Sequence, residues 1–202
     1  MVFPSMSRLG VGLTIAAVLT VSAAALAQAL RYRAYTENWT KPAGSEGENQ
    51  VDLLTTADFY GLQVITLWDY DHRVCAIQLE QAGFNTKSLS VQERVKLCEP
   101  RVAEIWRRAD VGSGRFITGV AVCVGGSEGV IRGLEVRGSP LAPNGVPRNS
   151  SQTGKFAFED CAWSELRSCP WPQVATGVRV YLDEVEKGAV GIALRCHRLE
   201  PR

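Results

Sequence analysis

The sequence predicts an all-β domain built from three copies of one two-stranded unit. Three glycines, Gly61, Gly119 and Gly177, lie 58 residues apart, and each is followed by a run in which apolar residues alternate with others. A polar turn and a second alternating run complete each copy, and the second runs are spaced by 57 and 58 residues. A two-residue apolar period is typical of strands, and self-similarity at a fixed spacing indicates a repeat architecture.

The repeats cover about residues 51–81, 106–138 and 163–196. Three such units around an axis protect their sheet edges, because each sheet lies against the edge of its neighbour. A β-prism has units of this size, whereas a β-trefoil has shorter repeats. We therefore predict a β-prism with pseudo-threefold internal repeats.

One stretch between the first two repeats, residues 87–110, departs from the strand pattern. Ser90-Val91-Gln92-Glu93 matches a capping box, which favours a helix start, and Pro100 would interrupt a helix that continued past it. Trp106, however, has the place before Gly119 that Trp163 has before Gly177, which favours equivalent strands. The sequence therefore allows one short helical insertion, followed by a strand.

The N-terminal segment has the pattern of a secretory signal peptide. Arg8 precedes an apolar stretch at 11–26, and Ala25-Leu26-Ala27 supplies small residues for cleavage, with Ala27-Gln28-Ala29 as a second site. The apolar stretch is shorter than the ~20 residues that a bilayer span needs. We predict a signal peptide at 1–27, no membrane span after its cleavage, and a single secreted or periplasmic domain at 28–202.

The composition excludes several classes of site. The formal net charge is +1, with 22 basic and 21 acidic residues mixed along the chain, so the basic stripe of a nucleic-acid-binding protein is missing. There are only two histidines, His72 and His197, and no Cys-x-x-Cys pair, so no structural metal site is expected. Neither histidine has a nucleophile motif around it, which argues against a hydrolase triad.

The third repeat resembles the repeat of the vitelline membrane outer layer protein I family. The similarity rests on Trp163-Ser164-Glu165, Cys169-Pro170, Gly177-Val178-Arg179-Val180 and Gly191-Ile192-Ala193-Leu194-Arg195-Cys196. The resemblance implies a β-prism of three Greek-key sheets that disulfides stabilise. The family has an Asp-Asn-Thr-Ala-like run before the closing strand, where this chain has Lys187-Gly188-Ala189-Val190, so we expect a different turn.

All six cysteines follow the export signal, and an even number in that context indicates disulfides. Cys169 and Cys196 are both present in the third copy and both missing from the other two, as expected for residues bonded to each other. For Cys75, Cys98, Cys123 and Cys161 three connectivities remain open. Of these we choose closure between nearest neighbours, Cys75–Cys98 and Cys123–Cys161.

Aromatic and acidic residues in the repeat turns are the candidate ligand-binding groups. They are Trp68, Asp69, Tyr70 and Asp71 in the first turn, and Asp183 and Glu184 in the third. Exposed aromatic faces beside carboxylates and amides can grip a sugar ring, by stacking on its face and hydrogen bonding to its hydroxyls. Sugar-binding β-prisms of the jacalin type resemble the predicted architecture, although their N-terminal glycine and Gly-rich loop ending in Asp are not evident here.

We therefore expect a non-enzymatic protein without cofactor or metal, which binds an extracellular glycan or serves as an extracellular structural component. The alternatives are a glycoside-active enzyme using turn carboxylates, such as Asp69 and Asp71, and a module that binds a protein partner through the same turns. Because Trp106 and Trp163 occupy matching places, we expect both to pack in the core.

Overall fold

In a computed structural model the chain is described over residues 32–70, 72–85, 88–98, 105–126, 129–183 and 188–201. The regular elements of these residues are strands: β1 (Tyr32–Trp39), β2 (Ala43–Gly44), β3 (Asn49–Leu54), β4 (Tyr60–Tyr70), β5 (Arg73–Gly83), β6 (Leu89–Val91), β7 (Val95–Lys96), β8 (Ile105–Asp110), β9 (Arg115–Gly125), β10 (Val130–Pro140), β11 (Gln152–Ala157), β12 (Ala162–Trp163), β13 (Arg167–Ser168), β14 (Val174–Leu182) and β15 (Ala189–Pro201). The predicted signal peptide, 1–27, lies outside the described residues. No helix in the described ranges has the length and apolar character to cross a bilayer.

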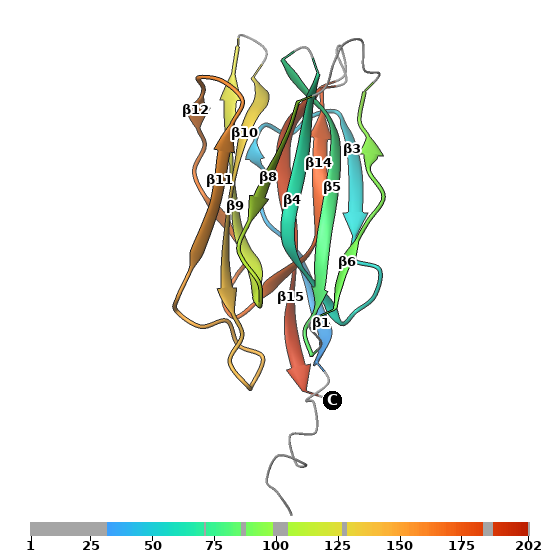
Figure 1. The fold of residues 1–202 in the computed structure, drawn as a ribbon, viewed down its shortest axis with the longest axis vertical. Helices are drawn as coiled ribbons and strands as arrows, with labels where there is room; N and C mark the ends of the chain where they lie inside the picture. Colours follow the sequence, from blue (N-terminus) through green and yellow to red (C-terminus); the bar gives the residue numbers. More distant parts are fainter. Residues whose placement is uncertain are drawn as a thin grey trace, which may run out of the picture.

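The strands form three antiparallel sheets that stand side by side around a common axis (Figure 1). Sheet 1 has the order β6-β5-β4-β8, with β7 also on β5; sheet 2 has the order β11-β10-β9-β12, with β13 also on β9. Sheet 3 has the order β1-β15-β14-β3, with β2 also on β15. Each sheet has a hairpin of two long strands at its centre, and the hairpins are those that the sequence repeats predict.

The outer strands complete a Greek key in each sheet. The strand after a hairpin pairs with its second strand, and a later one returns to its first, as β6 and β8 do on β5 and β4. The strand that precedes a hairpin in sequence therefore belongs to another sheet: β8 pairs with β4 rather than with β9. Sheet 3 draws its outer strands from the N-terminal part of the chain and its hairpin from the C-terminal part.

The core fills the space between the three sheets. Successive side chains of a strand point to opposite faces, so each hairpin sends one apolar row inward. Ile65, Leu67, Ile77 and Leu79 from the sheet 1 hairpin are fully buried there, with equivalent residues from the other two hairpins. The all-β prediction and the β-prism architecture are confirmed.

The predicted helical insertion is wrong for the described part of residues 87–110. Ser90 and Val91 of the capping-box pattern lie in β6, where Ser90 is opposite Gln81 of β5. Trp106 lies in β8, opposite Trp68 of β4. Pairing with the exposed sides of a long hairpin satisfies the backbone of these segments, and this outweighs the local preference for a helix start. Residues 99–104, which include Pro100, lie outside the described residues.

All three predicted disulfides are present: Cys75–Cys98, Cys123–Cys161 and Cys169–Cys196. Each joins a long hairpin strand to a connecting segment outside that strand, at sequence separations of 23, 38 and 27 residues. The covalent links therefore hold short, weakly paired segments against each of the three sheets.

Candidate functional site

Strands β4, β9 and β14 end, and strands β5, β10 and β15 begin, at the same end of the prism, the upper end in Figure 1. A side chain at Gly188, just before β15, would lie 3.6 Å from Val130 of β10 and 3.8 Å from Arg73 of β5. This convergence brings Asp69, near the end of β4, and Asp183, just after β14, to the same end of the molecule. Asp71 and Glu184 lie outside the described residues.

Trp68 and Tyr70 do not lie in an exposed turn, as the sequence predicts, but in a strand. Both lie in strand β4, and only 9% and 6% of their surfaces are exposed. Trp68 packs in a small cluster with Cys75, Ala76 and Tyr70, and the guanidinium of Arg94 lies 5.2 Å from its ring centroid. Neither aromatic offers an open face for stacking in this arrangement.

The predicted carboxylates differ in exposure. Asp69 is 8% exposed, and Asp183 is half-buried, with its backbone N–H donating to the carbonyl of Gly188 at 2.9 Å across the β14–β15 turn. Glu159, another carboxylate, lies 2.7 Å from Arg132 Nε and 3.2 Å from His72 Nδ1. Across the described ranges, no three His, Cys, Asp or Glu side chains are grouped so that they could hold a metal ion.

The exposed indoles belong to tryptophans outside the predicted turn. Trp106 is 57% exposed, Trp163 is 37% exposed and Trp171 is 68% exposed, so the prediction that Trp106 and Trp163 pack in the core is wrong. Both lie in outer strands, β8 and β12, which cover only part of their hairpins. A side chain on the outward face of an outer strand has few neighbours to cover it, which explains the exposure.

Trp163 and Trp39 each have a cationic side chain over one face of the ring. Lys155 Nζ lies 3.8 Å from the Trp163 ring centroid, and the Arg179 guanidinium lies 4.2 Å from that of Trp39. Lys155 also lies 2.9 Å from Glu135 Oε2. Although burial acts to raise it, the hydrogen bonds from Lys155 and Arg137 hold the pKa of Glu135 below its usual value. One ring face of Trp163 and of Trp39 is therefore already covered by a cation of the protein, and the carboxylate beside Lys155 is already paired.

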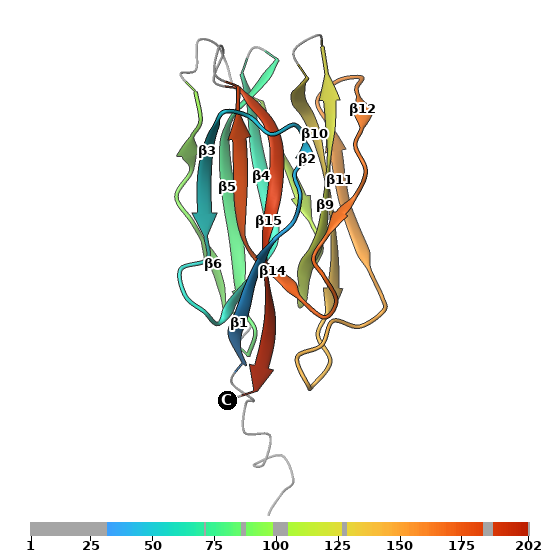
Figure 2. The ribbon, with the colours of Figure 1, turned by 180° about the vertical axis from the view of Figure 1, so that it is seen from behind.

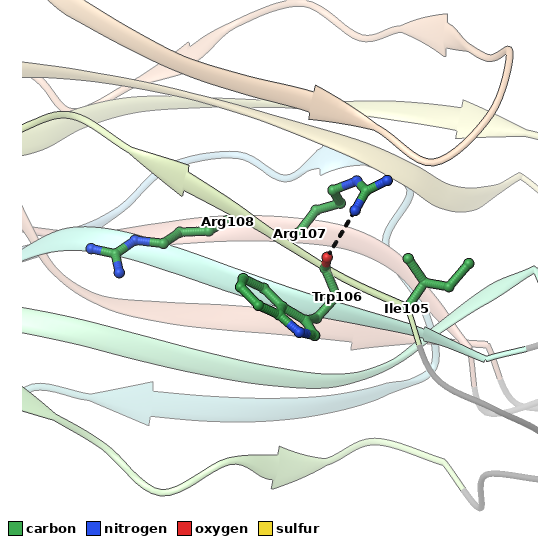
Figure 3. Close-up of a pocket in the computed structure, with 4 residues that line it drawn as sticks. All are labelled: Ile105, Trp106, Arg107 and Arg108. Atoms are coloured by element: carbon green, nitrogen blue, oxygen red, sulfur yellow. Dashed lines mark hydrogen bonds between the residues drawn. The ribbon is translucent and has the colours of Figure 1, made fainter.

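Trp106 is in a different situation, shown in Figure 3. No cation among the described residues lies over its ring. With Ile105, Arg107 and Arg108 it lines a shallow cavity of about 420 Å³ on strand β8. We call these four residues the Trp106 face.

The two arginines of the Trp106 face have different partners. Arg108 is fixed between Glu80 Oε1 and Asp110 Oδ2, each at 3.1 Å. Arg107 donates only to the carbonyl of Trp106, at 3.4 Å, and no carboxylate of the described residues lies within ion-pair distance of it. The cavity therefore combines an open indole with one guanidinium held in place and one without a carboxylate partner.

The sequence holds a weak signal of this face. Ile105-Trp106-Arg107-Arg108 does not alternate apolar and polar residues, unlike the hairpin strands, and all four residues are exposed. A strand without alternation next to a strongly alternating hairpin is typical of an outer strand with solvent on both faces.

Comparison with solved structures identifies the architecture. The chain is similar to the agglutinin of Calystegia sepium, with a TM-score of 0.54 and 11% identity over 81% of this chain and 98% of that one. The same lectin with a bisected glycan gives a TM-score of 0.51 at 11% identity, covering 83% and 99% of the two chains. The chain has the fold of the β-prism lectins. A prostate-specific glycoprotein lectin, WGA16, gives a TM-score of 0.50 at 13% identity, covering 82% and 100%.

At these identities the likeness extends to the fold alone. No protein-family model matches the chain, and comparison with curated protein sequences gives no match.

Proposed function

We propose that residues 28–202 form a secreted, non-enzymatic, glycan-binding domain, and that the Trp106 face is its stacking surface. The observation that carries the proposal is the 57% exposed indole of Trp106, which has no cation over its ring in the described residues. The apolar face of a sugar ring stacks on such an indole, while neighbouring polar groups bond to its hydroxyls. Three disulfides suit the oxidising environment outside the cytoplasm.

The two arginines favour an acidic glycan. Arg107 is exposed and has no carboxylate partner among the described residues, and its side chain leaves β8 on the side opposite the indole, whereas Arg108 leaves on the side of the indole (Figure 3). A guanidinium can donate two parallel hydrogen bonds to a carboxylate or a sulfate, and such bonds are stronger than those between neutral groups. Arg108, held by Glu80 and Asp110, adds a donor in a fixed position.

Further support comes from the fold. The Calystegia sepium lectin is described in complexes with a bisected glycan and with a biantennary N-glycan. A second candidate glycan site is the end of the prism that carries Asp69 and Asp183. Asp71 and Glu184, which belong to the same prediction, lie outside the described residues. Kinship with the vitelline membrane outer layer protein I family, and with it an extracellular structural role, also remains a proposal.

The test is a glycan array with the oxidised protein, run beside Trp106→Ala and Trp163→Ala. Loss of indole stacking should lower glycan retention at least about tenfold in Trp106→Ala. Trp163→Ala is the matched control, because it removes an indole from the equivalent outer strand of sheet 2, where a lysine already covers the ring.

Retention that is equal in the wild type and in Trp106→Ala would contradict the assignment of the site. A blank array with a folded protein would contradict glycan binding at the Trp106 face and would favour the structural role.

A further inference from the structure

A second cavity, of about 510 Å³, lies at the opposite end of the prism from the hairpin turns, the lower end in Figure 2. It opens where β4 and β9 begin and where β5 and β10 end. None of the predicted site residues and none of the Trp106 face lines it.

Two packed phenylalanines form its apolar wall. The rings of Phe84 and Phe116 have centroids 5.0 Å apart and an interplanar angle of 53°. A Cβ atom at Gly61 would lie 2.6 Å from an atom of each ring, so the rings rest directly on the backbone of β4. This contact requires glycine at position 61, and it fixes the wall before any ligand arrives.

Three polar side chains that line the cavity have no hydrogen-bond partner among the described residues. Gln63 is 4% exposed, yet its side-chain amide makes no hydrogen bond with any described residue. Asn85 and Ser113 also line the cavity, and within the described ranges their side chains are likewise unbonded. The amide of Gln63 lines the cavity and is not among the side-chain atoms that are fully buried without a partner, so water fills its hydrogen bonds until the hydroxyl groups of a ligand replace it.

The wall that carries Ser113 is held in place by a tight turn. The backbone N–H of Gly112 donates to Asp110 Oδ1 at 2.7 Å, and that of Arg115 donates to the Gly112 carbonyl at 3.3 Å. Gly112 and Gly114 have φ angles of 84° and 73°, which glycine adopts without strain. The cavity is therefore built from fixed parts.

We propose that this cavity binds a neutral sugar, as a second ligand site that is independent of the Trp106 face. The ring face lies on Phe84 and Phe116, and the hydroxyl groups bond to Gln63, Asn85 and Ser113. None of the described residues that line the cavity is charged, so a carboxylate brought among them would lose hydration without gaining an ion pair. The volume accommodates one or two sugar rings.

The test is a titration of the oxidised full chain, followed by NMR, with glucose, mannose, galactose and their N-acetylamino derivatives. We expect the best of them to bind with a dissociation constant of about 1 mM, as for a well-placed ligand of its size. The uronic acid of that hexose, which differs by one carboxylate, should bind at least about tenfold more weakly. The side-chain NH₂ signals of Gln63 should shift on binding.

Gln63→Met gives the decisive variant. It keeps the length of the side chain and removes an amide that has no partner in the described protein, so the fold should be unchanged and sugar affinity should fall at least about tenfold. Gln50→Met, on an exposed residue of β3, is the matched control. If Gln63→Met does not fold, Ser113→Ala replaces it, because Ser113 is exposed.

Four results would overturn the proposal: no binding by any sugar of the panel, equal binding of the uronic acid, unchanged affinity in the cavity variant, or loss of binding in Trp106→Ala. The last would place the sugar on the Trp106 face. Failure of the Trp106 face on the array leaves this titration unaffected, so the two proposals stand or fall separately.

Discussion

Trp68 and Trp106 show how far the surroundings of a residue decide its role. They lie opposite each other on neighbouring strands, yet their exposed fractions are 9% and 57%. Trp68 lies on a central strand and is covered by Arg94 and by the cluster around Cys75. Trp106 lies on an outer strand, and no cation of the described residues lies over its ring. The first is suited to stabilise the fold and the second to meet a ligand.

This difference predicts opposite effects of removing each indole. Trp68→Ala should lower the free energy of unfolding by about 3–5 kcal/mol, because it leaves a cavity in a packed cluster. Trp106→Ala should change it by less than about 1 kcal/mol, since most of its surface is already in water. Urea unfolding of the two oxidised variants measures both values. Similar losses in the two variants would show that Trp106 is packed rather than exposed.

His197 makes the stability depend on pH. It is buried in β15 and shares a hydrogen bond with the Thr176 hydroxyl. Burial, and then the charge of Arg195, lower the pKa of His197 below its usual value of 6.5. The unfolded chain therefore takes up a proton that the folded chain rejects. The folded state is therefore favoured most above the pKa that His197 has in the unfolded chain. This contribution to the free energy of unfolding is lost as the pH falls from there toward the lower pKa of His197 in the folded chain.

We predict a fall in the free energy of unfolding between pH ~7.5 and pH ~5.5 that is smaller in His197→Gln. Denaturant unfolding at the two pH values gives the comparison, with each protein as its own reference. An equal fall in the variant would mean that other groups cause the pH dependence.

At the scale of elements, the sequence is informative where strands are long. The six hairpin strands have nine to thirteen residues, enough for a two-residue apolar period to be recognised. Strands β7, β12 and β13 have two residues each and show no period. Their structure comes from pairing with a hairpin, a tertiary contact that local patterns do not encode. The helix prediction at Ser90 failed for this reason.

The cysteines were predictable because they differ between the copies. A pair present in one repeat and missing from the others marks a bond within that repeat, and Cys169–Cys196 confirms it. The candidate site was harder to predict, because exposure depends on which strand covers which. That Trp106 lies on the outside follows only once β8 is known to pair with β4.

Removal of the Cys169–Cys196 bond tests its role in the sheet 3 element. It ties the segment before β14 to β15, across a separation of 27 residues. The chain-entropy account gives a loss of about 3–4 kcal/mol for a loop of this length in Cys169→Ala/Cys196→Ala. Urea unfolding of this double variant, with the other two disulfides intact, measures the loss. An unchanged transition midpoint would show that the bond adds nothing beyond the strand pairing.

At the scale of the whole molecule, the β-prism closes by joining distant parts of the chain. Strands β1 to β3 complete sheet 3 around the β14–β15 hairpin, and Tyr32 of β1 lies opposite Pro201 of β15. The two candidate surfaces lie on different parts of this closed body. The Trp106 face is on an outer strand of sheet 1. The cavity lined by Phe84 and Phe116 is at the end opposite the hairpin turns, between sheets 1 and 2.

Because Tyr32 and Pro201 are antiparallel partners, a circular permutant should keep the fold. A Gly-rich turn of about three residues would join 201 to 32 as a hairpin. New ends between Ser150 and Ser151 would fall in an exposed connection before β11, where no strand is cut. We expect one cooperative thermal transition within a few degrees of the parent, and unchanged glycan retention. The control is a permutant with its new ends within β9, which should not fold because a hairpin strand is cut. If the first permutant also fails to fold, the prism needs its N-terminal strands to be first in the chain, and the final contacts alone are not enough.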